Sequence, residues 1–407
     1  MHGTAGKGDV MSAEGVCFPE GFAASGMASG IKHSGKKDIA LIYSETPCVA
    51  AACCTTNRAK SFSLLWSMKR IHNPIRAVLI NSGNANALGG PEGWNITCRI
   101  MENLAGVMGI SQENLLCAST GLIGRVLPEE TILRVIPALV KGLSRDGGMD
   151  AAQSIITTDR HVKQVHFATG ITGMSGNVKI GAMAKGAGMI CPNMATMLAF
   201  ITTDANILRG ALKKALSNAV SESFNMITVD GDQSTNDFVV CLANGQARNS
   251  TIREGSPEFV EFSESLLEAC CLLAKMIAGD GEGATKRMEV IVEGAWSKKD
   301  ARRIAKKIAG SNLVKAAFAG SWPNWGRIAA ACGSASARCD FRRIRISIGS
   351  HVVYDGAPVQ YCEDDLRRTL SEKEVVFKID LKQGNGRAVA WGCDLTEDYV
   401  RINMEKE

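Results

Sequence analysis

The stretch KGAGMICPNMATMLAFITTDA, residues 185–205, joins a glycine-rich loop to an apolar run. Small residues lead up to Ala195, and Thr196 opens the run from Met197 to Ile201, which is typical of a buried strand. A loop that carries a lysine and ends at this threonine has two interpretations. It is either an ordinary junction between loop and strand or a place where the chain cuts itself to expose a nucleophile. The local pattern alone favours the ordinary junction.

Short strand-like runs alternate with helical runs along the rest of the chain. The strand candidates are apolar or alternating runs at 38–43, 76–80, 162–168, 196–202, 238–242, 288–293, 343–348 and 374–381. The helix candidates carry apolar residues at three-to-four spacing, at 95–108, 128–143, 208–223, 257–278, 298–309 and 363–370. This order predicts a layered α+β or α/β protein. A nucleotide-binding doubly wound sheet is not indicated, because no G-x-G-x-x-G motif opens a helix after a strand.

The length and the charge of the chain limit its domain organisation and its possible partners. A chain of 407 residues exceeds the size at which one core usually keeps growing, so we expect two lobes or one large layered domain. The net charge is +5, and the basic residues are spread thinly, which disfavours nucleic acid as a partner. The one dense basic region, from Lys298 to Lys307, has helical spacing and is interpreted as a solvated helix face.

The cysteines and the apolar runs indicate the compartment. Fourteen cysteines occur without a CxxC motif, and we interpret them as small buried hydrophobic residues in a reducing compartment. No apolar run reaches the roughly 18 to 20 residues that a membrane span needs, and residues 1–15 lack the features of a signal peptide. We therefore expect a cytoplasmic protein without a membrane partner.

The self-cleavage interpretation of residues 185–205 has a clear chemical basis. A threonine hydroxyl is a weak nucleophile and needs an adjacent base. Breaking the bond between Ala195 and Thr196 would free an α-amino group, with a pKa of about 7.7 to 8.0, on the same residue. Other polar segments bracketed by glycine add candidate site residues. The segment CASTGLIG offers the Thr120 hydroxyl and the Gly121 backbone N–H, which are the kinds of donor that stabilise an oxyanion.

Ten segments in a fixed order carry a resemblance to a known family. They are GIKHSGKKDIALIYS, TTNRAK, INSGNANA, STGLIG, TTD, KGAGMICPNMATML, FNMITVDGDQSTND, DGEGATK, PNWGRI and DLTEDYVRIN. Together they make the chain similar to the ornithine acetyltransferase family, also called glutamate N-acetyltransferase, of arginine biosynthesis. Any one segment alone would be a weak signal, but the ordered set spans about residues 18 to 403.

The resemblance implies a sheet sandwich flanked by helices that cuts itself before Thr196. The products would be an α chain of residues 1–195 and a β chain of residues 196–407, associated as an α2β2 heterotetramer. Thr196 would take the acetyl group from N-acetylornithine, release ornithine and pass the acetyl group to glutamate. The resemblance implies that Thr120 and Gly121 form the oxyanion hole. It also implies that the substrate is contacted by Thr157, Lys185, Thr196, Glu282 and Asn403. The resemblance implies no metal or nucleotide cofactor, although some relatives also accept acetyl-CoA.

The sequence departs from the family pattern at three places. Arg160 follows TTD where a threonine is usual, and Trp322 precedes PNWGRI where an aspartate is usual. The family chain also continues past the position of Asn403 to a final Ser or Thr that binds substrate, whereas this sequence stops at Glu407. We therefore expect one substrate contact to be missing.

Two other functions stay open at this point. One is an aminopeptidase-like hydrolase that uses the same self-generated nucleophile, and the other is an uncleaved relative that only binds. Asp230 and Asp232 could ligate a cation, but their spacing lacks the rest of a calcium-loop pattern. The histidines are isolated from one another, which argues against a metal cluster or a catalytic triad.

Overall fold

The computed structural model describes residues 15–172, 176–191 and 197–404, which form two compact units. Unit 1 takes Met1–Gly186, Asn193–Ser221 and Gln233–Leu273, and unit 2 takes Ala187–Pro192, Glu222–Asp232 and Ala274–Glu407. The chain therefore leaves unit 1 after Gly186, Ser221 and Leu273, and returns to it at Asn193 and Gln233. None of the helices in the described part of the chain combines the length and the apolar composition of a membrane span.

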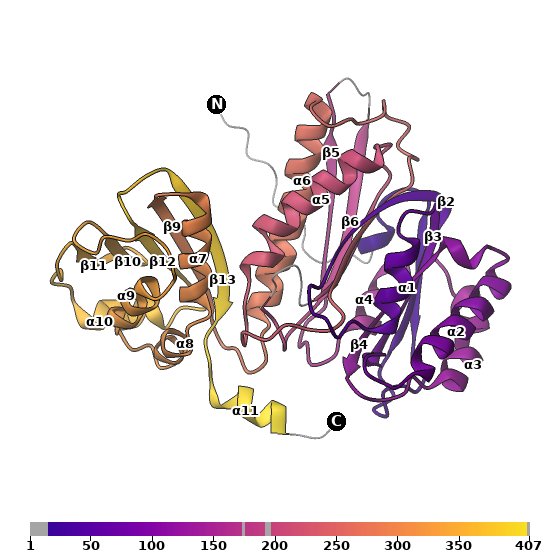
Figure 1. Ribbon diagram of the computed structural model, residues 1–407, viewed down its shortest axis with the longest axis horizontal. Coiled ribbons are helices and arrows are strands. Elements are labelled where there is room, and N and C mark those ends of the chain that lie inside the picture. Colours follow the sequence, from indigo (N-terminus) through magenta and orange to yellow (C-terminus); the bar gives the residue numbers. More distant parts are fainter. Residues whose placement is uncertain (1–14, 173–175, 192–196, 405–407) are drawn as a thin grey trace. The chain divides into compact units, whose positions relative to one another are not determined.

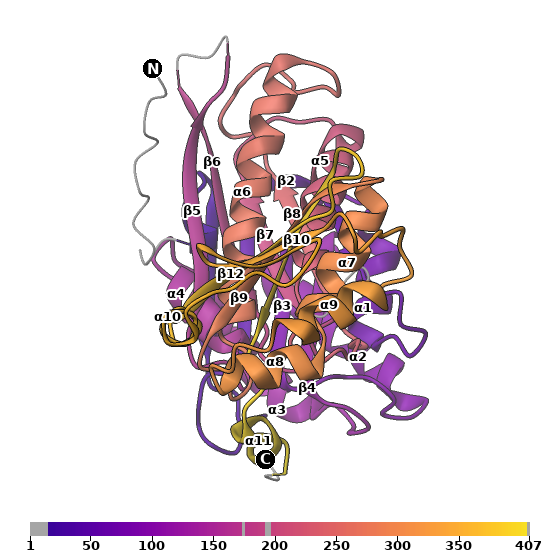
Figure 2. The same cartoon turned by 90° about the vertical axis from the view of Figure 1, so that its left-hand side faces the viewer.

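Unit 1 is built on an eight-stranded mixed sheet (Figure 1). Its strands are β1 (Phe22–Met27), β2 (Ile39–Cys54), β3 (Ile75–Asn84), β4 (Leu115–Leu122), β5 (Lys163–Gly170), β6 (Asn177–Lys185), β7 (Leu198–Thr203) and β8 (Phe238–Ala243). They are ordered β4-β3-β2-β8-β7-β6-β5, and β1 pairs with β2. The antiparallel pair β5 and β6 runs side by side in Figure 2.

Strand β2 joins the two halves of this sheet because it is sixteen residues long. Its first part pairs with β1 and β3, and its second part pairs with β8. The expected strand at 38–43 was therefore too short. The register shifts between Tyr43 and Cys48, and this irregularity accommodates Pro47, which lacks the N–H that a regular ladder needs. A proline in the sequence thus marked a bulge inside the strand and not its end.

Helices cover the sheet of unit 1, and alternate strand residues face different helices. They are α1 (Phe62–Arg70), α2 (Glu92–Met108), α3 (Glu129–Lys141), α4 (Gly148–Ile155), α5 (Arg209–Glu222) and most of α6 (Pro257–Gly279). Ile39 and Leu41 belong to the core cluster that contains α2 and α3, whereas Ala40 and Ile42 belong to the cluster that contains α4. The strands are thus buried on both faces.

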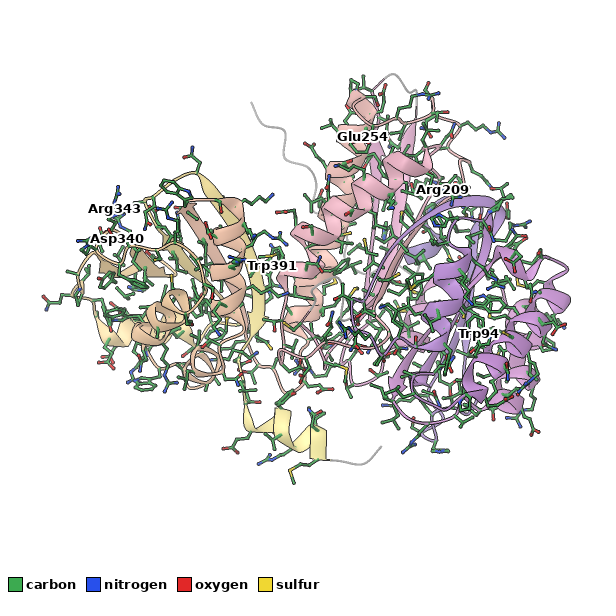
Figure 3. All side chains as sticks on the ribbon, in the orientation of Figure 1. Trp94, Arg209, Glu254, Asp340, Arg343 and Trp391 are labelled. Atoms are coloured by element: carbon green, nitrogen blue, oxygen red, sulfur yellow. The ribbon has the colours of Figure 1, made fainter. Side chains whose placement is uncertain are left out.

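Aromatic side chains of α1 and α2 pack against each other in unit 1. Trp94 lies on α2 (Figure 3), and its ring centroid is 6.1 Å from that of Trp66 on α1. The Trp66 indole N–H donates to the Leu115 carbonyl oxygen at 3.0 Å, which ties α1 to the beginning of β4. This contact fixes α1 against the strand that ends at Thr120 and Gly121.

Unit 2 contains a five-stranded sheet ordered β11-β10-β12-β9-β13. Its strands are β9 (Arg287–Ala295), β10 (Arg345–Ile348), β11 (His351–Asp355), β12 (Glu374–Asp380) and β13 (Gly386–Cys393). Its helices are α7 (Lys298–Ala309), α8 (Asn312–Ala319), α9 (Trp325–Gly333), α10 (Glu363–Leu370) and α11 (Glu397–Met404). In β12, Val375, Phe377 and Ile379 are buried while the intervening residues are exposed, as expected for a sheet with one covered face. The described residues also contain three 3-10 helices: η1 (Gly15–Cys17), η2 (Gln112–Asn114) and η3 (Phe224–Met226).

The layered mixed α/β fold is therefore confirmed, with two sheets and flanking helices. Every helix candidate of the sequence corresponds to a helix, and α7 and α10 have the expected bounds. The basic residues of α7 lie on its partly or fully exposed positions, whereas Ile304 and Ile308 are buried, as the helical spacing indicated. All fourteen cysteines lie in the described ranges, none of them forms a disulfide, and eight are buried.

Candidate functional site

The first group of site residues lies at the end of β4 in unit 1. Thr120 pairs with Ser82 of β3, and Gly121 pairs with Gly83. The backbone of Gly121 has φ +128°, and a Cβ atom there would lie 2.3 Å from the carbonyl carbon of Gly83. Only glycine fits this close approach of two strands. The glycine thus fixes the course of the backbone that presents the Gly121 N–H next to the Thr120 side chain.

Lys185 brings the polar residues of unit 1 together. It is the last residue of β6, where it pairs with Leu198 of β7, and its side chain is 9% exposed. The Lys185 ammonium group donates to the Thr157 hydroxyl at 2.8 Å and lies 3.4 Å from the Thr120 hydroxyl. Three residues that are far apart in the sequence therefore meet at one buried ammonium group.

Asp159 holds this cluster in place, although the sequence analysis had not singled it out. Its fully buried carboxylate accepts from the Lys163 ammonium group at 2.7 Å and lies 3.8 Å from that of Lys185. It also accepts from the backbone N–H of Thr157 at 3.0 Å and of Gly186 at 2.6 Å. One carboxylate thus orients the loop of Thr157, the Lys185 side chain and the first residue after β6. The only signal in the sequence was the position of Asp159 in the TTD segment.

The charge state of Asp159 follows from these contacts. Burial by itself would raise the pKa of the Asp159 carboxyl group, but the nearby charges of Lys185 and Lys163 outweigh burial and hold the pKa below its usual range. The side chain is therefore ionised at neutral pH. With two lysines and one carboxylate, this trio carries one net positive charge, which suits the binding of an anionic group.

The second group of site residues lies in unit 2. The Asn403 side-chain amide donates to the Glu282 carboxylate at 2.8 Å and to the Tyr399 carbonyl oxygen at 2.9 Å. The Glu282 backbone N–H donates to the Ala187 carbonyl oxygen at 3.0 Å. A Cβ atom at Gly188 would lie 2.4 Å from the Glu282 carboxyl carbon, so a larger residue here would push the end of the Glu282 side chain aside. The loop after Lys185 is thus shaped around Glu282.

Asp230 forms hydrogen bonds with the backbone of the same loop. Its carboxylate accepts from the Ile190 backbone N–H at 2.8 Å and from the Met189 backbone N–H. Burial, and after it the carboxylates of Asp230, Glu282 and Asp232, raise the pKa of Tyr399 to about 12. The Tyr399 phenol therefore stays neutral at pH 7. Asp230 acts as a hydrogen-bond acceptor here, and within the described ranges no group of three or more His, Cys, Asp or Glu side chains could hold a metal ion.

The structure thus joins the predicted site residues in two sets. Thr120, Thr157 and Lys185 meet in unit 1, with Gly121 beside Thr120, and Glu282 and Asn403 meet in unit 2. Ala195 and Thr196, the predicted cleavage residues, lie outside the described residues. The described part of β7 begins at Leu198, two residues after the expected start of the strand.

Comparisons with known proteins show which family the sequence resembles. The model of the ArgJ family matches residues 23–406. The arginine biosynthesis bifunctional protein ArgJ of Symbiobacterium thermophilum is 48% identical over 395 residues, covering 96% of this chain and 98% of the relative. That of Synechocystis sp. is 42% identical over 402 residues, covering 96% of this chain and 97% of the relative.

One solved structure adds a likeness in three dimensions. The crystal structure of arginine biosynthesis bifunctional protein argJ from Bacillus halodurans is 47% identical and has a TM-score of 0.50. The match covers 50% of this chain and 97% of the solved chain. The family model covers nearly the whole sequence and the relatives share close to half of its residues, so this chain belongs to the ArgJ family.

Proposed function

We propose that this ArgJ-family enzyme moves the acetyl group from N-acetylornithine to glutamate through an acetyl ester on Thr196, and so serves arginine biosynthesis. The observation that carries the proposal is the buried contact of Lys185 with Thr157 and Thr120, set within a chain that matches the ArgJ family over residues 23–406. The free α-amino group of Thr196 would be the base that this chemistry needs.

The exchange balances in two half-reactions. The Thr196 hydroxyl oxygen attacks the acetyl carbonyl carbon, and its proton passes through the α-amino group to the leaving nitrogen, so that ornithine departs as the C–N bond breaks. The amine of glutamate then attacks the acetyl ester and the C–O bond to Thr196 breaks, while a proton of the amine passes through the α-amino group to the Thr196 oxygen. Acetyl-CoA can enter only as another acetyl donor, because its thioester would form the same acetyl-threonine. These steps require no metal or nucleotide cofactor.

The residues of the two groups suit these steps. The Thr120 hydroxyl and the Gly121 N–H would stabilise the oxyanion that forms during each attack. Lys185, which belongs to a trio with net positive charge, would bind the carboxylate of the amino acid. Glu282 and Asn403 would hold the head group of the amino-acid substrate. Thr157 would orient Lys185 and contact the substrate.

The order of strands in unit 1 supports association of the two fragments after cleavage. Strands β7 and β8 would belong to the β chain, yet they pair with β6 and β2 of the α chain. The backbone ladders thus cross from one fragment to the other at both edges of the β7–β8 pair. The solved Bacillus halodurans chain is almost wholly covered by a match to half of this chain, which also fits a protein that is split in two. We extend the proposal to an α2β2 assembly in the cytoplasm.

Intact-mass spectrometry combined with an exchange assay tests the proposal. Wild-type protein should give two fragments that divide between Ala195 and Thr196, and the Thr196→Ala variant should stay intact. Incubation with labelled N-acetylornithine and glutamate should move the label onto glutamate and, in part, onto the β fragment. A single intact mass for fully active wild-type protein would refute the mechanism. Release of free acetate without N-acetylglutamate would instead identify a hydrolase.

A further inference from the structure

Two cysteines of unit 2 face each other at the end of helix α9. Cys332 lies one residue before the end of α9, and Cys339 lies in the loop that leads to β10. Their sulfur atoms are 3.9 Å apart and share a hydrogen bond. Neither cysteine forms a disulfide, and neither belongs to the site described above. The contact joins the end of the helix to the loop that follows it.

The chain between the two cysteines turns back on itself. Ser336 has a φ of +52°, in the left-handed region that reverses the chain direction, and its carbonyl oxygen accepts from the Arg303 guanidinium group of α7 at 3.1 Å. After the turn, the Phe341 ring lies against Gly333, where a Cβ atom would be 3.2 Å from the ring. Contacts on both sides of the turn therefore keep the two cysteines next to each other.

The two thiols differ in exposure, which sets the order in which they can react. Cys332 is 1% exposed, whereas Cys339 is only half-buried. Asp340 and Arg343, in the same loop, lie at the periphery of unit 2 (Figure 3). The hydrogen bond with Cys332 lowers the pKa of the Cys339 thiol, and the thiolate is the form that attacks a disulfide. Cys339 is therefore the accessible nucleophile, with Cys332 in contact as the resolving thiol.

We propose that Cys332 and Cys339 form a reversible oxidation site whose oxidant is a low-molecular-weight disulfide, such as oxidised glutathione. The Cys339 thiolate attacks one sulfur of the oxidant, the S–S bond of the oxidant breaks, and one thiolate leaves. The Cys332 sulfur then attacks the Cys339 sulfur of this mixed disulfide, and the second thiolate leaves as the bond between the cysteines forms. The two leaving thiolates take up the two protons of the cysteines, so two protein thiols are oxidised and one oxidant is reduced to two thiols.

The reaction requires only a local movement. A disulfide has a sulfur–sulfur distance of about 2.0 Å, so the two sulfur atoms must approach each other by about 2 Å. The bond would tie the end of α9, which contains most of the PNWGRI segment, to the loop before β10. Opening of this loop should then become rarer, because the cross-link removes open conformations. A pair that is reduced at rest also fits a reducing compartment, where disulfides are usually transient.

Peptide mapping of the full-length protein tests the oxidation site. Reduced protein, freed of reductant, is incubated with oxidised glutathione, its remaining thiols are alkylated in denaturant, and it is digested with trypsin. Trypsin cuts after Arg338, so Cys332 and Cys339 fall on separate peptides, 328–338 and 339–342. We expect these peptides to be joined, with the loss of two hydrogen atoms, and to separate after treatment with dithiothreitol. Hydrogen exchange of the amides between the two cysteines should slow on the order of 10-fold in the oxidised protein.

Two serine variants are the matched controls. Cys332→Ser should stop with glutathione attached to Cys339, because the resolving thiol is missing. Cys339→Ser should leave Cys332 unmodified, because Cys332 is buried. The exposed Cys362 of the same unit should carry glutathione in all three proteins, which shows that the oxidant has reacted.

The wild-type protein alone decides the outcome, so a variant that does not fold leaves the test intact. Joined peptides 328–338 and 339–342 support the proposal. Modified Cys362 with both thiols of the pair still reduced would overturn it, and so would a lasting mixed disulfide at Cys339. A bond from Cys339 to any other cysteine would also refute the pair. Oxidation of the pair does not require acetyl transfer, so none of these results bears on the proposed function.

Discussion

Replacing Asp159 by asparagine should destabilise unit 1 and disturb the proposed binding site for the substrate carboxylate. Asp159→Asn keeps the shape of the side chain but removes the negative charge that lies 2.7 Å from the Lys163 ammonium group and 3.8 Å from that of Lys185. The Lys163 side chain is 1% exposed and that of Lys185 is 9% exposed, so water cannot replace the lost charge. Breaking one partner of a buried ion pair costs about 3 to 5 kcal/mol.

Hydrogen exchange is the suitable assay, because a chain with two units need not unfold in one step. Amides of β5 and β6 in unit 1 should lose protection by the equivalent of about 3 to 5 kcal/mol, whereas amides of β9 and β12 in unit 2 serve as the internal reference. The matched control is Asp204→Asn. Asp204 is also buried but accepts from backbone N–H groups of Lys179 and Glu20, so we expect a cost of about 1 kcal/mol.

The stability difference between wild type and Asp159→Asn should depend on pH in a defined direction. The pKa of Asp159 is lowered in the folded protein, so its contribution to stability is present above the unfolded pKa of about 4 and is lost as the pH falls toward the folded pKa. The difference between wild type and Asp159→Asn should therefore shrink below about pH 4. An equal loss of protection in both aspartate variants, or a difference that grows in acid, would refute the ion-pair reasoning.

Three further predictions concern close approaches and the strand order. Gly121→Ala would place a Cβ atom 2.3 Å from the Gly83 carbonyl carbon, so kcat for acetyl transfer should fall by about 10²- to 10³-fold; an unchanged kcat would show that Gly121 does not shape the oxyanion site. Gly188→Ala would displace the Glu282 carboxylate, so KM for glutamate should rise about 10-fold in steady-state assays; an unchanged KM would exclude Glu282 from binding it. The cleaved fragments should co-elute in size-exclusion chromatography and separate only in denaturant, because β7 and β8 pair with strands on both sides; separation without denaturant would contradict this.

The proposed site could be found from the sequence only in part. Thr120, Thr157 and Lys185 were identified through ordered motifs, and the structure brings the three side chains together in unit 1. Asp159 was missed because a TTD segment is also a common turn, and nothing local shows that its carboxylate faces two lysines. Asn236, which bonds to the residue before Thr120, was visible only as part of a polar segment, since its partner Ser119 is distant along the chain.

The sequence by itself indicated six helices, α2, α3, α5, α6, α7 and α10, and eight of the strands, because burial imposes a period of 2 on strands and of 3.6 on helices. The alternation in β12 and the spacing of α7 are examples, and the exposed faces followed from them. The sequence did not indicate α1, α4, α8, α9 or α11. Only the tertiary structure decided that β7 and β8 lie between β2 and β6, and that one strand, β2, links the two halves of the sheet. Strand order and buried charge pairing depend on contacts between distant residues, and these contacts leave no periodic trace along the chain.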